Sequence, residues 1–164
     1  MIYRKKILPG LLLSLVFLGI GLLINKDFGL AVDESNVMAA GQYNVRALPA
    51  LLLQGEIPSW SPHDLPGYYF VVDTIRAYVA KVVLSFNPSI GFIHAFNIGN
   101  LVFSSAAILV LYLLAYCLTE SLTLSLAAAV AMAISPQYIA HSQNNAVDLV
   151  SLFVFSLSIY DSLS

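Results

Sequence analysis

Cysteine and charge are both scarce in this chain of 164 residues, and each scarcity excludes a class of protein. Cys117 is the single cysteine, so the chain forms no internal disulfide, and no Cys/His spacing typical of zinc sites occurs. Charged residues make up 10% of the chain, against about 25% in ordinary soluble domains. The net charge of −2 and the scattered basic residues argue against nucleic acid as a partner.

Apolar residues take the place of the missing charges. They make up 59% of the chain, and the mean hydropathy is +0.84. No charged residue occurs between Lys6 and Lys26, between Lys81 and Glu120, or between Glu120 and Asp148. An ionised group inside hydrocarbon is costly, so such stretches are typical of a polytopic membrane protein.

The apolar runs predict an all-α polytopic membrane protein with about four transmembrane helices. We expect the spans at residues 7–24, 98–118, 122–139 and 146–164. The first run falls within the spanning range of about 17–25 residues. It also resembles a signal-peptide core because a basic segment precedes it, but no small-x-small cleavage site follows, which favours a retained helix.

Basic residues at the N-terminus predict the orientation of these spans. Arg4, Lys5 and Lys6 precede the first span, and the positive-inside rule places such a cluster in the cytoplasm. Alternation then places the turn at 119–121 in the cytoplasm and residues 25–97 and the predicted loop 135–147 on the opposite side. We therefore expect a multi-pass integral membrane protein, of the plasma membrane or the endoplasmic reticulum, with a cytoplasmic N-terminus.

The first outer loop, residues 25–97, is predicted to hold amphipathic helices at the membrane interface. The pattern favours a helix from Glu34 to about Ala47, and Pro49 is expected to end or bend it. Residues 55–67 are rich in proline and indicate a loop with defined turns.

A second helix is predicted over residues 68–86, where apolar residues recur at three- and four-residue spacing. Asp73 and Arg76 have the spacing of a helical ion pair, and Lys81 is a third charge beside the apolar stripe. A stripe beside charges is typical of a helix that lies on the bilayer surface.

Two short segments carry a resemblance to a known family. They are residues 29–38 (Gly-Leu-Ala-Val-Asp-Glu-Ser-Asn-Val-Met) and residues 135–148 (Ser-Pro-Gln-Tyr-Ile-Ala-His-Ser-Gln-Asn-Asn-Ala-Val-Asp). Their order and predicted topology resemble the N-terminal part of GT-C-type integral membrane glycosyltransferases, in particular the protein O-mannosyltransferase and aminoarabinose transferase branches. Members of this family have many more spans, so the resemblance implies an N-terminal portion, residues 1–164, of a larger module.

The resemblance implies an enzyme that transfers a sugar from a polyprenyl-phosphate donor to an acceptor hydroxyl on the extracytoplasmic side, with inversion. The acceptor would be a protein, a lipid or a glycan. The alternative is a non-catalytic membrane subunit or a truncated remnant of such an enzyme. A transporter is disfavoured because the first three predicted spans carry no charge and because no pair of spans broken by glycine or proline is predicted.

Asp33 is the residue on which the resemblance places the catalytic role of general base. A carboxylate within hydrogen-bond reach of the attacking hydroxyl can take its proton. The competing interpretation of Asp33 is an N-cap of the following helix. Glu34 suits the first turn of that helix, where an acid interacts favourably with the helix dipole. Its functional alternative is to orient the acceptor or to help ligate a divalent cation. The sequence assigns no cofactor, and a divalent cation is an open alternative.

His141, Asn145 and Asp148 form a second group of candidate substrate-binding residues, predicted on the same side as Asp33. Asn145 and Asp148 also have the spacing of an N-cap and its box partner. His141 is alternatively a hydrogen-bonded loop residue. Arg46 is a candidate for the lipid phosphate, with an interfacial, snorkelling side chain as the alternative.

Overall fold

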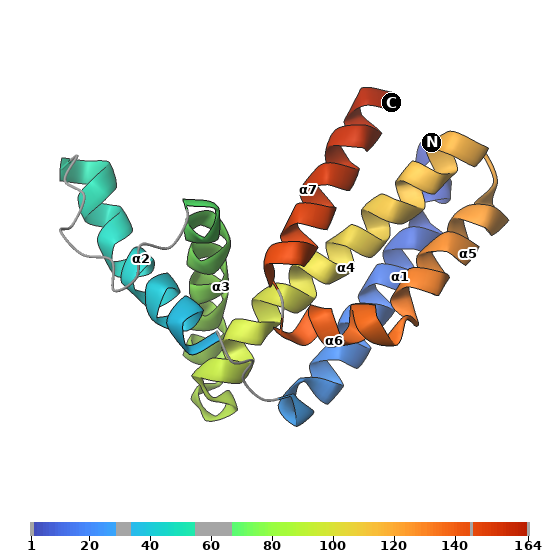
Figure 1. Cartoon of the computed structure of the whole chain (residues 1–164). Coiled ribbons are helices and arrows are strands. Elements are labelled where there is room, and N and C mark those ends of the chain that lie inside the picture. Colours follow the sequence, from blue (N-terminus) through green and yellow to red (C-terminus); the bar gives the residue numbers. More distant parts are fainter. Residues whose placement is uncertain (1, 29–33, 55–66, 145, 164) are drawn as a thin grey trace. The chain divides into compact units, whose positions relative to one another are not determined.

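The computed structural model of the chain describes residues 2–28, 34–54, 67–144 and 146–163, and within these ranges every regular element is a helix (Figure 1). This confirms the all-α fold class for the described residues. The helices in chain order are α1 (Ile2–Ile24), η1 (Asn25–Asp27), α2 (Glu34–Gln54), α3 (Gly67–Phe86), η2 (Pro88–Ile90), α4 (Phe92–Thr119), α5 (Leu122–Ala133), α6 (Pro136–Asn144) and α7 (Ala146–Leu163).

Among the described residues, two helical segments are long and apolar enough to cross a membrane, Lys6–Asp27 and Phe92–Thr119. Helices α5 and α6 make a third if the pair counts as one span, although they are bent by 62° at the break between them. These segments support a membrane protein. The fourth predicted span corresponds to α7, and its insertion in the membrane stays a prediction.

The break between α5 and α6 divides the stretch predicted as the third span, residues 122–139. The backbone N–H of Ile134 donates to Val130 O (2.9 Å) and that of Ser135 to Met132 O (3.1 Å), which tightens the last turn of α5. Pro136 lacks an N–H and starts α6, as proline prefers. The prediction of a loop over residues 135–147 is therefore wrong, because most of that stretch is α6.

The chain divides into two compact units, residues 1–25 with 100–164 and residues 26–99. In the first unit, α5 packs beside α1 (Figure 1). Polar side chains donate from one helix to backbone carbonyls of another. Ser14 Oγ donates to Ser105 O, and Tyr112 Oη donates to Lys6 O, both at 2.6 Å. In lipid, helices gain no hydrophobic driving force from packing together. Hydrogen bonds between helices therefore help to hold them in place.

The core of this unit consists of side chains from α1 and from α4 to α7. Its buried members are Phe17, Ile108, Tyr112, Ala129, Ala133, Tyr138 and Leu149. Large apolar side chains also cover the outside of α1, among them Leu12, Leu15 and Val16, each more than half exposed. An apolar exterior around a partly polar interior is the arrangement expected of a helix bundle in lipid.

In the second unit, α2 packs along α3. Helix α3 confirms the helix predicted over residues 68–86. The predicted end of α2 near Ala47 is wrong, because the helix continues through position 49 to Gln54. A proline inside a helix removes one hydrogen bond and disfavours it locally, but packing against a neighbouring helix can outweigh that cost.

Helix α3 buries two of its three charged residues, Asp73 and Arg76, and exposes Lys81 and several apolar side chains. Asp73 is fully buried and Arg76 is 2% exposed, whereas Phe86 is 85% exposed. Arg76 Nη1 lies 3.5 Å from Asp73 Oδ1, which confirms the predicted pairing. The Arg76 guanidinium lies inside the unit, with Cζ 3.9 Å from the centroid of the Phe96 ring.

Glycines allow neighbouring helices to approach this buried pair. A Cβ at Gly41 would lie 2.6 Å from the carbonyl oxygen of Asp73, and one at Gly99 would lie 3.0 Å from the Cα of Arg76. The first distance is shorter than atomic contact permits, so position 41 requires glycine while α3 keeps its present distance from α2. The second is a tight contact, so a side chain at position 99 would require the Arg76 backbone to shift by a few tenths of an ångström.

Replacing Arg76 by glutamine should destabilise the protein by about 3 kcal/mol, because it leaves the Asp73 carboxylate buried without its charged partner. We expect Lys81→Gln, at an exposed position of the same helix, to change the free energy of unfolding by less than about 0.5 kcal/mol. Unfolding by SDS titration in mixed micelles measures both variants. If the two variants are equally stable, the Asp73–Arg76 pair contributes nothing to the free energy of unfolding.

Candidate functional site

A cavity of about 370 Å³ opens where α5, α6 and α7 meet. Its lining includes a carboxylate, an imidazole, two hydroxyl groups and an amide, together with apolar side chains. The lining residues are Met132, Ser135, Gln137, Tyr138, His141, Asp148, Leu149 and Leu152. The volume falls in the range of about 300–1,000 Å³ that is usual for small-molecule sites.

His141 and Asp148, two of the predicted substrate-binding residues, both line this cavity. His141 lies in the last turn of α6, and Asp148 lies in the first turn of α7, where a negative charge interacts favourably with the helix dipole. Because α7 starts only two residues after α6 ends, the two helix ends bring these side chains to one wall.

Tyr138 is a residue of the cavity lining that contacts two neighbouring helices. Its side chain is 8% exposed, and its hydroxyl donates to the carbonyl oxygen of Ser104 on α4 at 2.7 Å. The ring also lies 5.6 Å, centroid to centroid, from the ring of Phe17 on α1. Tyr138 therefore links the cavity lining to α4 through its hydrogen bond and to α1 through the contact between the rings.

Gln143 holds the end of α6 that carries His141. Its side-chain Nε2 donates to Gly21 O on α1 at 3.2 Å, and its backbone carbonyl accepts from Asn100 Nδ2 on α4 at 3.1 Å. Gln143 is fully buried, so each bond lies in a poorly solvated interior where a lost partner is costly. These bonds fix the orientation of α6 and, with it, the position of the imidazole two residues earlier.

The polar groups of the cavity suit a ligand rich in hydroxyls. Asp148 supplies acceptor oxygens, and Ser135, Gln137 and His141 each supply a donor and an acceptor. Leu149 and Leu152 give an apolar wall, as carbohydrate and other small-molecule sites commonly have. The arrangement can bind and orient a polar ligand.

The other predicted site residues lie outside what the structure describes or in the other unit. Asp33 and Asn145 are outside the described residues. Glu34 begins α2 and Arg46 lies within it, but their side chains are outside the description. All three of Asp33, Glu34 and Arg46 belong to the unit of residues 26–99, so their proximity to His141 and Asp148 stays a prediction.

No group of three or more His, Cys, Asp or Glu side chains within the described ranges is arranged to hold a metal ion. The carboxylates of Asp33 and Glu34 lie outside the described side chains. The divalent cation that the sequence left open therefore has no ligand set among the described side chains.

Sequence reasoning missed Gln137 and Tyr138 as part of the site. Both precede His141 by a helical interval, four and three residues, so they share a helix face with it. With residues 135–147 predicted as a loop, the spacing of Gln137 and Tyr138 from His141 had no meaning. Residues three or four positions apart share a face only in a helix.

Comparison of the chain with models of protein families, with curated proteins and with solved structures finds no match.

Replacing Gln143 by methionine should detach the C-terminal end of α6, because it removes the donor to Gly21 O while keeping the side-chain volume. We expect a loss of about 1–2 kcal/mol in the free energy of unfolding and faster hydrogen exchange in α6. Gln137→Met, at an exposed position of the same helix, is the matched control. Unchanged exchange in the Gln143 variant would contradict the anchoring role.

Proposed function

We propose that the chain is the N-terminal part of a membrane glycosyltransferase that transfers a sugar from a polyprenyl-phosphate donor to an acceptor hydroxyl. The observation that supports it best is the cavity that His141 and Asp148 line in a helical membrane bundle, within the segment that resembles GT-C-type enzymes. A carboxylate beside an imidazole suits hydrogen bonding to the hydroxyls of a sugar.

The proposal includes a topology of four spans with the N-terminus in the cytoplasm. In this arrangement α6 and residues 25–97 face the extracytoplasmic side, where a long-chain lipid donor presents its headgroup. Asp33, Glu34 and Arg46 would then lie on the same side of the membrane as the cavity. The basic cluster that starts α1 supports this orientation.

In the proposed reaction, the acceptor oxygen gives its proton to the Asp33 carboxylate as it attacks the anomeric carbon. The bond from that carbon to the phosphate oxygen breaks, and polyprenyl phosphate leaves with the bonding electrons. Attack opposite the leaving group inverts the anomeric configuration. Asp148 and His141 orient sugar or acceptor hydroxyls, and Arg46 faces the phosphate charge.

The second candidate function is a membrane subunit or remnant that binds the lipid-linked sugar without transferring it. The chemistry of the described cavity favours it as much as catalysis, because a site that orients hydroxyls binds without reacting when no base reaches the acceptor. Donor binding without transfer is the result that separates the two candidates.

The topology predicts which positions an impermeant maleimide reaches from the extracytoplasmic side. Single cysteines replace Ala39, Gln137 and Glu120, three exposed residues, in a Cys117→Ser background. Positions 39 and 137 should react in intact cells or sealed vesicles of the corresponding orientation. Position 120 should react only after permeabilisation. If positions 137 and 120 instead become reactive under the same condition, they lie on the same side of the membrane, and the proposed site is refuted.

Replacing Asp33 by asparagine should lower sugar transfer at least about 100-fold, because general bases contribute that much to such steps. Membranes that contain the complete enzyme, of which this chain would be the N-terminal part, are incubated with polyprenyl-phosphate mannose or aminoarabinose, and labelled product is measured. Asp27→Asn, at an exposed position six residues earlier, controls for the loss of a carboxylate. Full transfer by the Asp33 variant would exclude Asp33 as the general base. Donor binding without transfer by the wild type would favour the second candidate function, a non-catalytic membrane subunit.

A further inference from the structure

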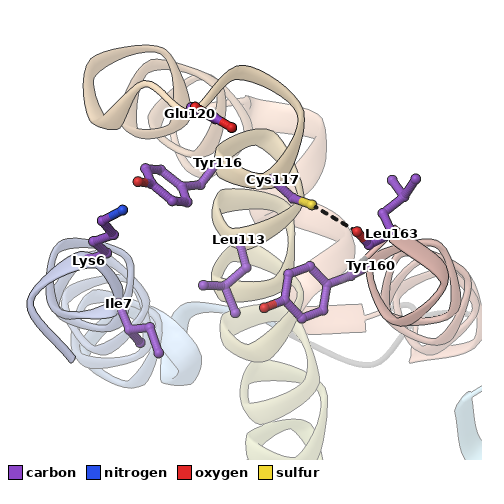
Figure 2. A pocket seen from close by; sticks show the side chains of 8 residues that line it. All are labelled: Lys6, Ile7, Leu113, Tyr116, Cys117, Glu120, Tyr160 and Leu163. Atoms are coloured by element: carbon purple, nitrogen blue, oxygen red, sulfur yellow. Dashed lines mark hydrogen bonds between the residues drawn. The ribbon is translucent and has the colours of Figure 1, made fainter. Parts of the chain in front are cut away.

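A second and larger cavity, of about 500 Å³, lies where the start of α1 and the ends of α4 and α7 meet. Its polar lining comes from Lys6, Tyr116, Glu120 and Tyr160, and its apolar lining includes Ile7 and Leu113. Figure 2 shows the Lys6 and Tyr116 side chains directed toward one another and the Tyr160 ring extending from α7 toward Leu113. None of these residues belongs to the candidate sugar site.

This cavity is well separated from the candidate sugar site. Asp148 and Tyr160 both lie on α7, twelve residues apart, which corresponds to about 18 Å along a helix axis. Lys6 is the first residue of one candidate span, and Glu120 follows the last residue of the other. The cavity therefore lies at the level where the apolar helices end, which is the level of lipid headgroups.

The cavity combines one fixed cation with neutral donors. Lys6 Nζ lies 5.1 Å from the centroid of the Tyr116 ring, so the ammonium is held over the ring face by a cation–π contact. The hydroxyls of Tyr116 and Tyr160 supply two further donors on separate helices. A group with several acceptor oxygens and a negative charge, such as a phosphodiester, fits this set.

The remaining lining residues suit the parts of a lipid next to its phosphate. Glu120, whose φ of 51° places it in the left-handed turn after α4, supplies an acceptor for a headgroup hydroxyl. Ile7 and Leu113 contact the apolar side, where a glycerol backbone and the first acyl carbons would lie. Arg4 and Lys5 precede Lys6 directly in the sequence and add to the attraction for an anionic leaflet.

We propose that this cavity binds the headgroup of an anionic phospholipid, with the phosphodiester at Lys6, Tyr116 and Tyr160 and a headgroup hydroxyl at Glu120. The proposal requires α1 and α4 to span the membrane but does not depend on the glycosyltransferase function. Its failure would leave the candidate sugar site untouched, because the two cavities share no lining residue.

The test measures lipid binding by native mass spectrometry of the purified chain in mixed micelles of phosphatidylglycerol and phosphatidylcholine. The wild type should retain phosphatidylglycerol in preference to phosphatidylcholine. Lys6→Gln should weaken phosphatidylglycerol binding about fivefold, the equivalent of one basic residue at the surface. Lys26→Gln, which removes an exposed cation next to the other end of α1, should leave binding unchanged.

Two further variants separate a built cavity from diffuse attraction by positive charge. Tyr160→Phe removes one hydroxyl without changing charge and should weaken binding about threefold, whereas the exposed Tyr78→Phe should have no effect. Leu113→Trp fills the cavity and should abolish the preference. Full binding by the Tyr160 variant would overturn the proposal, and so would equal binding of soluble glycerol phosphate, which would assign the cavity to a soluble ligand.

Discussion

The hydrogen bonds of Gln143 are the interaction on which the candidate sugar site depends. Helix α6 has only nine residues, and isolated helices of that length are unstable in water. It is held because Gln143 bonds to Gly21 on α1 and to Asn100 on α4, while Tyr138 bonds to Ser104. This attachment holds the last turn of α6, which carries His141.

The same preference, polar groups inside and apolar groups outside, governs both units. In one unit, serine and tyrosine hydroxyls bond to carbonyls across helices. In the other, Asp73 and Arg76 are buried against Phe96, and apolar residues of α3 face outward. Surrounding lipid cannot satisfy a polar group, so an interior partner lowers the free energy of each one. This arrangement is the strongest physical support for a membrane protein.

The two cavities have different polar groups, and each set of groups suits a different kind of ligand. The cavity at α6 and α7 has a carboxylate, an imidazole and an amide, which suit an uncharged ligand with many hydroxyls. The cavity at Lys6 has an ammonium and two phenols at the start and end of the candidate spans, which suit an anionic lipid. Lipid bound at Lys6 would join α1, α4 and α7 at one end, as Gln143 joins α1, α4 and α6 nearer the other.

The sequence alone determined the all-helical class, the two clearest spans and the bounds of α3, because charge-free runs and helical spacing are local properties. It also indicated His141 and Asp148, from their neighbouring positions in one segment. It did not reveal that α5 and α6 are two helices with a bend before Pro136. Nor did it reveal that α2 continues past position 49 or that Arg76 is buried. Those outcomes, like the cavity that joins residues 6, 116 and 160, were decided by contacts between residues distant in the sequence. Local spacing contains no information on such contacts, so only the tertiary structure decided them.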